Sequence, residues 1–270
     1  MGYHKPFEEF RFRDWRNQVA TGGAPVGFQP QTTSIEFNGI DEAMRNQTEQ
    51  SIGIGTVWSI LINFRRRSDT QGLTQVNTML QLFGSATQNR IFIDANGAEA
   101  NDPIVVETFG TNGSLNKRFL WNDTIFPFDV WLQMILVWNN SGTALTMYRN
   151  GILVARSGQT AQNNFTMNST NRRVQIGQNG GVQPYSGFIH SIALYNADVA
   201  SAAVELYNGG TVSSLDLNAA SFNANLSHWW RLGQDPSDLG KDSGIAATLI
   251  DVDVDSLNID ASDISSESPA

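Results

Sequence analysis

The sequence predicts an all-β protein in which two antiparallel sheets pack face to face as a sandwich. Three observations lead to this fold class. Many short segments alternate apolar and polar residues, turns rich in Gly and Asn separate these segments, and charged residues make up only 16% of the chain. A strand with one buried face alternates in this way, whereas an amphipathic helix shows a 3.6-residue period. About a dozen such strands fit one sandwich domain of this length.

The segment 131–156 shows this pattern most clearly. Residues 131–138 are almost entirely apolar, as expected for a strand that is covered on both faces. A second strand follows around Met147, and Asn150-Gly151 then reverses the chain into a third. Asn-Gly favours a type I′ hairpin turn, because both central residues of that turn need positive φ. We therefore expect an antiparallel meander at the centre of the fold.

Further strands follow from the same alternation and the same turn residues. They are expected at residues 33–37, 57–64, 78–83, 90–94, 104–109, 118–121, 173–177, 187–195 and 226–232. One short helix is expected near residues 198–208. Asp198 can cap its first turn, an apolar stripe includes Val199 and Leu206, and Gly209 ends it.

Composition divides the chain into an N-terminal arm (1–32), a sandwich domain (33–250) and an acidic C-terminal tail (251–270). Four aromatic side chains alternate with charged ones in the arm: Phe7, Phe10, Phe12 and Trp15. So short a segment cannot bury four rings by itself, so the arm either folds back on its own domain or docks on a neighbouring subunit. The tail is either an exposed edge strand or a solvated segment.

The net charge, the cysteine count and the distribution of apolar residues exclude several classes of function. A net charge of −9 argues against a nucleic-acid partner, because phosphate binding needs a basic face. The chain has no cysteine, and therefore no disulfide frame, thiol nucleophile or thiolate metal site. No apolar run is long enough for a membrane span, and the N-terminus lacks the apolar core of a secretory signal peptide.

Six segments share their order and spacing with a known domain family: residues 34–39, 57–60, 131–137, 148–151, 175–177 and 185–196. Together they resemble the concanavalin A-like lectin/glucanase superfamily, and within it the laminin-G-like (pentraxin-like) domains. The resemblance covers roughly residues 33–210. It implies a jelly-roll of two antiparallel sheets, one of them concave. Residues 229–233 and 242–244 are also similar to segments beside such domains in viral and bacterial surface proteins.

Because the superfamily includes glucanases, the sequence must be searched for the carboxylates that a glycoside hydrolase needs. Glycoside hydrolysis usually needs two carboxylates on either side of the bond that is cleaved. The glucanases of this superfamily carry them at alternate positions of one strand, and this sequence has no such triplet. Glu36, Asp41 and Glu42 lie across a turn, where solvated carboxylates are expected. Neither a metal-ligand spacing around the three histidines nor a nucleophile elbow is present. We therefore expect a protein that is not an enzyme.

Two kinds of ligand site remain as expectations. The resemblance implies calcium at a rim loop, for which Asp94, Asn96, Glu99 and Asp102 could supply oxygen ligands. The alternative is a simple turn in which Asp and Asn bond their own backbone. A glycan site needs stacking rings and planar amides, for which the candidates are Trp121, Asn122, Asn179, Gln183, Tyr185 and Trp229. Trp58, Trp131 and Trp138 are expected in the core. No cofactor is required.

We expect a non-enzymatic structural or adhesion protein of a virus particle, on the external surface of a tailed bacteriophage. It would be a head decoration, a fibre or a tail-associated subunit, forming homo-oligomers and contacting other virion proteins. The reasons are a lectin-type sandwich without catalytic carboxylates, the missing signal peptide, and two end segments suited to contacts between subunits. The alternative is a carbohydrate-binding module for a surface glycan, with or without calcium. A divergent glycoside hydrolase is the third reading.

Overall fold

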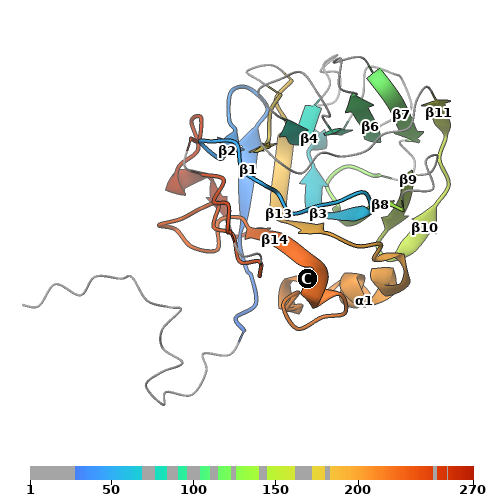
Figure 1. The fold of residues 1–270 in the computed structure, drawn as a ribbon. Coiled ribbons are helices and arrows are strands. Elements are labelled where there is room, and N and C mark those ends of the chain that lie inside the picture. Colours follow the sequence, from blue (N-terminus) through green and yellow to red (C-terminus); the bar gives the residue numbers. More distant parts are fainter. Residues whose placement is uncertain are drawn as a thin grey trace, which may run out of the picture.

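The computed structural model shows two antiparallel sheets stacked as a sandwich, which confirms the predicted fold class (Figure 1). It describes residues 28–68, 77–83, 91–95, 104–109, 115–122, 126–139, 145–161, 172–179, 183–245, 248–253 and 255–270. Most of the predicted strands appear within one or two residues of their expected ends. They form because alternate apolar side chains of each strand face a shared core.

The first sheet has eight strands. Seven of them run in the order β10 (Ile152–Val154), β9 (Leu145–Arg149), β8 (Trp131–Trp138), β3 (Trp58–Arg66), β13 (Ser186–Tyr195), β1 (Ser34–Asn38) and β15 (Ile264–Ser265). The eighth strand, β14 (Leu226–Arg231), also pairs with β13. Strands β3 and β13 are therefore central, and the predicted meander of β8, β9 and β10 runs outward to one edge. Its turn is as predicted, because Asn150 and Gly151 have φ of 51° and 78°.

The second sheet has seven strands. Their order is β11 (Gly158–Ala161), β7 (Leu115–Trp121), β6 (Ile104–Phe109), β5 (Ile91–Ala95), β4 (Asn77–Phe83), β12 (Arg173–Ile176) and β2 (Met44–Arg45). Each strand pairs antiparallel with its neighbours. Between β5, β6 and β7 this sheet is a simple meander, whereas β12 joins it next to β4 from far along the chain.

The main hydrophobic core lies between the two sheets. It includes Trp58 and Trp138, which are fully buried and stacked with their ring centroids 6.1 Å apart. Trp131, in contrast, is half-buried and contacts Phe188 and His190 on the outer face of the eight-stranded sheet. The prediction that Trp131 is a core residue is wrong, because alternation along β8 turns position 131 to the face opposite Met134 and Leu136.

A second, smaller core covers part of the outer face of the eight-stranded sheet. Residues 199–222, which we call the cap segment, contribute Val199, Leu206 and Leu217 to it. The expected helix lies here, but it is divided into two 3-10 turns, Ala200–Ala202 and Asn208–Gly210, around α1 (Ala203–Tyr207). In Figure 1, α1 lies on the side of the eight-stranded sheet that is remote from β4, β6 and β7. None of the described helices is long and apolar enough to span a membrane.

The acidic C-terminal segment packs onto the sandwich instead of remaining solvated. Ile250 and Val252 are fully buried, and β15 pairs with β1. Of the two alternatives, an edge strand is the one that the structure shows. It is formed by Ile264 and Ser265, however, and not by the acidic alternation at residues 251–255.

Candidate functional site

The three aromatic residues that were candidates for stacking a sugar are all buried. Trp121 is 0% exposed and lies in the main core, because its position on β7 alternates inward with Phe119. Tyr185 is 1% exposed and donates its hydroxyl to the Arg65 carbonyl over 2.9 Å. Trp229 is 4% exposed and belongs to the second core. These three rings therefore form no exposed platform, and they are divided between the main core (Trp121 and Tyr185) and the second core (Trp229).

The candidate amides are partly brought together. Asn179 donates its side-chain Nδ2 to Gln183 Oε1 over 2.7 Å, so these two residues satisfy each other. Asn122 is half-buried at the end of β7, next to the buried Trp121. The predicted glycan set is thus one bonded amide pair and one isolated amide.

Of the predicted calcium ligands, the structure describes Asp94. It lies inside β5 and is 3% exposed, not in an open loop. Asn96, Glu99 and Asp102 fall outside the described residues, so the calcium site stays a prediction. Among the described residues, no group of three His, Cys, Asp or Glu side chains could hold a metal ion. The four aromatic residues of the arm (Phe7, Phe10, Phe12 and Trp15) also lie outside the described residues.

The outer face of the seven-stranded sheet carries a row of six side chains, five polar and one aromatic, that crosses five strand pairs. Direct cross-strand partners in this row are Arg45 with Gln175, Gln175 with Gln81, Gln81 with Phe92, Phe92 with Glu107, and Glu107 with Arg118. We call these six residues the amide row. Their neighbours along the strands, such as Leu82, Ile93 and Val174, belong to the main core. Because side chains alternate along a strand, the amide row faces away from the core.

The centre of the amide row is buried without being satisfied. Gln175 is 0% exposed, and among the residues that the structure describes neither its Oε1 nor its Nε2 has a hydrogen-bond partner. Gln81 Oε1 lacks a partner as well, and so does Oε1 of Gln178, just beyond β12. Buried polar atoms are nearly always bonded, so a group of unpaired amide atoms is unusual and marks the centre of the row as a place where a water molecule or a ligand can bond.

The two ends of the amide row are charge-balanced. Arg45 Nε lies 2.7 Å from Asp255 Oδ2, and Arg118 Nε lies 3.3 Å from Glu107 Oε1. The side chains of Arg45, Glu107 and Arg118 keep about a quarter of their surface exposed. Burial raises the pKa of Glu107, and the charge of Arg118 works against this rise. The row therefore presents neutral amides at its centre and paired charges at its ends.

A second carboxyl group lies beside the amide row. Asp94 accepts a hydrogen bond from Thr78 Oγ1 over 2.7 Å, directly across the β4–β5 pair. Burial raises the pKa of Asp94 to about 7, and the nearby charge of Glu107 adds to the rise. Asp94 is paired in register with Val105, so Glu107 is its diagonal neighbour on the same face, with Cα atoms about 7–8 Å apart.

We expect the Asp94→Asn variant to be more stable than the natural chain above pH 7. An acid whose pKa is higher in the folded state loses stability as the pH rises from its unfolded pKa, about 4, to its folded pKa. For Asp94 the folded value is about 7. Asparagine stays neutral, so the variant should gain up to about 4 kcal/mol at pH 8 and show a flatter pH profile.

Urea unfolding between pH 4 and pH 8 measures this difference. Asp253→Asn removes one carboxylate at a half-buried position, and it controls for the loss of a single charge. Parallel profiles for Asp94→Asn and the natural chain would show that Asp94 ionises freely in the folded protein.

The carboxylates near the first turn are not all solvated as expected. Glu42 is 7% exposed and accepts a hydrogen bond from the Asn38 backbone amide. Burial raises the pKa of Glu42 to about 7. Glu36 is paired with Arg67. Glu42 follows the end of β1, and its burial reflects packing of the C-terminal segment, which the sequence alone does not reveal.

Sequence reasoning missed Gln81, Phe92, Glu107, Arg118 and Gln175. A usable signal was present, since Gln81 and Gln175 interrupt the apolar residues of two predicted strands with large polar side chains. Such a residue marks the face opposite the core. Gln81 and Gln175 become partners only because β12 joins the sheet beside β4. Local alternation does not determine this strand order.

Comparison with known proteins supports the fold. Residues 58–205, more than half of the chain, match the family described as the concanavalin A-like lectin/glucanases superfamily. No curated protein matches the sequence.

Several solved structures are similar in fold. A candidate carbohydrate-binding protein from Bacteroides ovatus is 12% identical, with a TM-score of 0.50, over 79% of this chain and 55% of that one. A heptameric SAP-like pentraxin from Limulus polyphemus is 11% identical, with a TM-score of 0.47, over 67% of this chain and 84% of that one. The CBM40 domain of a Ruminococcus gnavus sialidase, bound to α2,3-sialyllactose, is 12% identical, with a TM-score of 0.44, over 67% of this chain and 98% of that one. At such identities the similarity shows the fold alone.

Proposed function

Because the chain belongs to the concanavalin A-like lectin/glucanases superfamily, we propose that it binds a carbohydrate through the amide row. The observation that carries this proposal is Gln175, whose two amide atoms are buried and unpartnered on the outer face of the seven-stranded sheet. Sugar hydroxyls both donate and accept hydrogen bonds, so one sugar can satisfy Oε1 and Nε2 of the same amide.

The other members of the row suit the same ligand class. Phe92 lies between Gln81 and Glu107, and its ring supplies an apolar surface of the kind that packs against the C–H face of a sugar. Carboxylate and guanidinium groups at one end add directional hydrogen bonds. Since Arg45 and Arg118 are already paired with carboxylates, the row favours a neutral sugar over an acidic one.

Burial sets a condition on this proposal. Gln175, Gln81 and Phe92 are at most 5% exposed, so a sugar reaches them only if the centre of the row opens in the bound state. Glu107 and Arg118, whose side chains are about a quarter exposed, are then the first groups that a ligand meets. Binding is therefore expected to change the backbone amide signals of β4 and β12 as well as those of β6 and β7.

We expect the Gln175→Ala variant of the full chain to lose at least tenfold in affinity for any glycan that the natural chain binds. A buried, uncharged group that forms a hydrogen bond with a ligand contributes about 1–3 kcal/mol to the binding free energy. Its removal therefore lowers the affinity by about tenfold or more. A glycan array followed by titration of the strongest hit measures it, with and without a chelator to test the proposed calcium dependence.

Gln47→Ala is the matched control, because Gln47 is exposed and lies outside the amide row. Unchanged affinity in the control, together with retained folding of both variants, attributes the loss to the row. A natural chain that binds no glycan on the array would refute carbohydrate binding, whereas equal binding by Gln175→Ala would place the site elsewhere.

Hydrolysis is a second candidate, and one observation favours it. Asp94 and Glu107 are two carboxyl groups on one face of neighbouring strands, in diagonal positions of the kind that can place two acids on either side of one bond. Asp94, whose burial raises its pKa to about 7, would be the acid that protonates the leaving oxygen. Its partner Glu107 is held by Arg118, which disfavours the role of base. Glycan cleavage that disappears in Asp94→Asn while binding remains would establish the enzyme.

The virion role predicted from the sequence stays a prediction, since neither the fold nor the comparisons support it. It is compatible with glycan binding, because an adhesion subunit needs a surface receptor. It also depends on an arm that docks on a neighbouring subunit. Sedimentation of the full chain beside a chain without residues 1–32 tests that part, and identical assembly of the two would remove the arm's role.

A further inference from the structure

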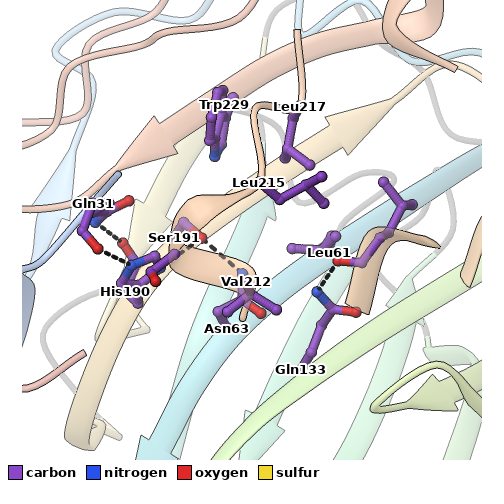
Figure 2. Close-up of a pocket in the computed structure, with 12 residues that line it drawn as sticks. Gln31, Leu61, Asn63, Gln133, His190, Ser191, Val212, Leu215, Leu217 and Trp229 are labelled. Carbon is purple, nitrogen blue, oxygen red and sulfur yellow. Dashed lines mark hydrogen bonds between the residues drawn. The ribbon is translucent and has the colours of Figure 1, made fainter. Parts of the chain in front are cut away.

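A small cavity lies on the opposite side of the molecule from the amide row, between the outer face of the eight-stranded sheet and the cap segment (Figure 2). Its floor comes from Asn63 on β3, Gln133 on β8 and Ser191 on β13. Gln31, Trp229 and the cap segment close it. The cavity is about 10 Å3, close to the volume that one water molecule needs.

Three side-chain amides line this cavity, and each is anchored through its nitrogen. Gln31 Nε2 donates to the His190 carbonyl over 2.6 Å, and Gln133 Nε2 donates to the Leu206 carbonyl over 2.8 Å. Asn63 Nδ2 donates to Ser191 Oγ over 2.9 Å. The two carbonyl acceptors fix the amide orientation of Gln31 and Gln133, because a carbonyl oxygen only accepts. All three amides are at most 4% exposed, and within the described part of the chain the oxygen of each has no hydrogen-bond partner.

Trp229 supplies the complementary group. Its indole Nε1, a donor only, is buried and has no partner. Figure 2 shows this nitrogen at the end of the ring that faces the other lining residues. The cavity therefore combines one unpaired donor with three unpaired acceptors.

We infer that the cavity holds one ordered water molecule, which accepts a hydrogen bond from Trp229 Nε1 and donates to two of the three amide oxygens. Buried waters typically make about three hydrogen bonds to groups that are otherwise unsatisfied, and this arrangement offers that number. The water links the sheet to Trp229 and to Gln31 where the cap segment covers them. It is a structural ligand, separate from the proposed glycan site.

A monovalent cation is the competing occupant, and the lining disfavours it. No carboxylate is among the lining residues, and burying an uncompensated charge is costly. The indole N–H would also point its positive end at the ion. His190 is neutral near pH 7, because burial lowers the pKa of its ring to about 4, so it supplies no charge that would balance the ion.

The indole protons of the tryptophans allow a direct test on the full chain. With 15N-labelled tryptophan, a water-selective NOE experiment should give a cross-peak from water to the Trp229 indole proton. Trp230 is the internal control, because its indole Nε1 donates to the Ile250 carbonyl over 2.6 Å and is already satisfied. Trp230 should give no such peak.

Asn63→Leu keeps a similar volume but removes one acceptor, and it should weaken the water peak at Trp229 while the Trp230 signal stays in place. Absence of the Trp229 peak in the natural chain would refute the ordered water. A Trp229 signal that moves on titration with K⁺ or NH₄⁺, against N-methylglucamine as the inert salt, would assign the cavity to a cation and overturn the proposal.

Discussion

The Asp242→Ala variant should lose about 3–5 kcal/mol of unfolding free energy, because a buried hydrogen-bond network loses its shared acceptor. The carboxylate of Asp242 and the ring of His228 are both fully buried, with Oδ2 and Nδ1 2.6 Å apart. The same carboxylate accepts backbone hydrogen bonds from Trp229, Gly244 and Ile250 at 2.9–3.0 Å. Asp242 thus joins β14 to the C-terminal segment, and alanine would leave all four donors unpaired.

Urea unfolding measures this loss, and Asp235→Ala is the matched control. Asp235 forms a surface pair with Lys241 at 3.2 Å, so its removal should cost less than about 1 kcal/mol. Burial alone would raise the pKa of Asp242, but the interactions with His228 and the backbone amides hold it below its ordinary value. Its stabilisation is therefore complete above about pH 4 and is lost as the pH falls further. Equal losses for both variants would show that the carboxylate is not structural.

The Gly187→Ala variant should be destabilised by about 2–6 kcal/mol, because backbone strain and overpacking add at one position. Gly187 lies in β13 with φ of 144°, and an added Cβ would stand 2.3 Å from the Arg65 carbonyl oxygen of the adjacent strand. That oxygen belongs to the backbone of a central strand and cannot move aside alone.

Gly209→Ala separates the two causes of this loss. Gly209 also has positive φ, 63°, but an added Cβ there meets nothing within 4 Å. Gly209→Ala should lower the unfolding free energy by only about 1–2 kcal/mol, which is the energy that a residue with a Cβ needs to adopt a left-handed conformation. Thermal unfolding of both variants gives the comparison, and a Gly187→Ala variant as stable as Gly209→Ala would mean that the strand relaxes around the methyl group.

Local pattern was sufficient to predict most of the strands and part of the helix, but not the short strands β2, β11 and β15. The Asn150-Gly151 turn has the positive φ values that a type I′ hairpin needs, and Val199 and Leu206 are buried as the helical stripe requires. Trp131 shows what local pattern cannot predict. In a strand that is apolar on both faces, alternation does not say which face meets the main core, and the answer depends on the neighbouring strands.

The candidate site could not be predicted from the sequence for the same reason. Gln81 and Gln175 are far apart in the sequence and become partners only through the long-range register of β4 with β12. Candidate tryptophans were chosen by residue type, yet burial assigned Trp121 to the core and Trp229 to the second core. Strand order in space, which sets both outcomes, is a property of the whole chain.

The pairing of β1 with β15 has a consequence for biosynthesis. Strand β1 is made early, but one of its two neighbours consists of Ile264 and Ser265. Its other neighbour, β13, also lies well over a hundred residues downstream. A nascent chain thus carries β1 with neither edge satisfied during most of its translation, and the sheet closes only after residue 265 has left the ribosome. During that interval the unpaired edges of β1 can pair with another chain, which is the usual aggregation hazard of an open strand.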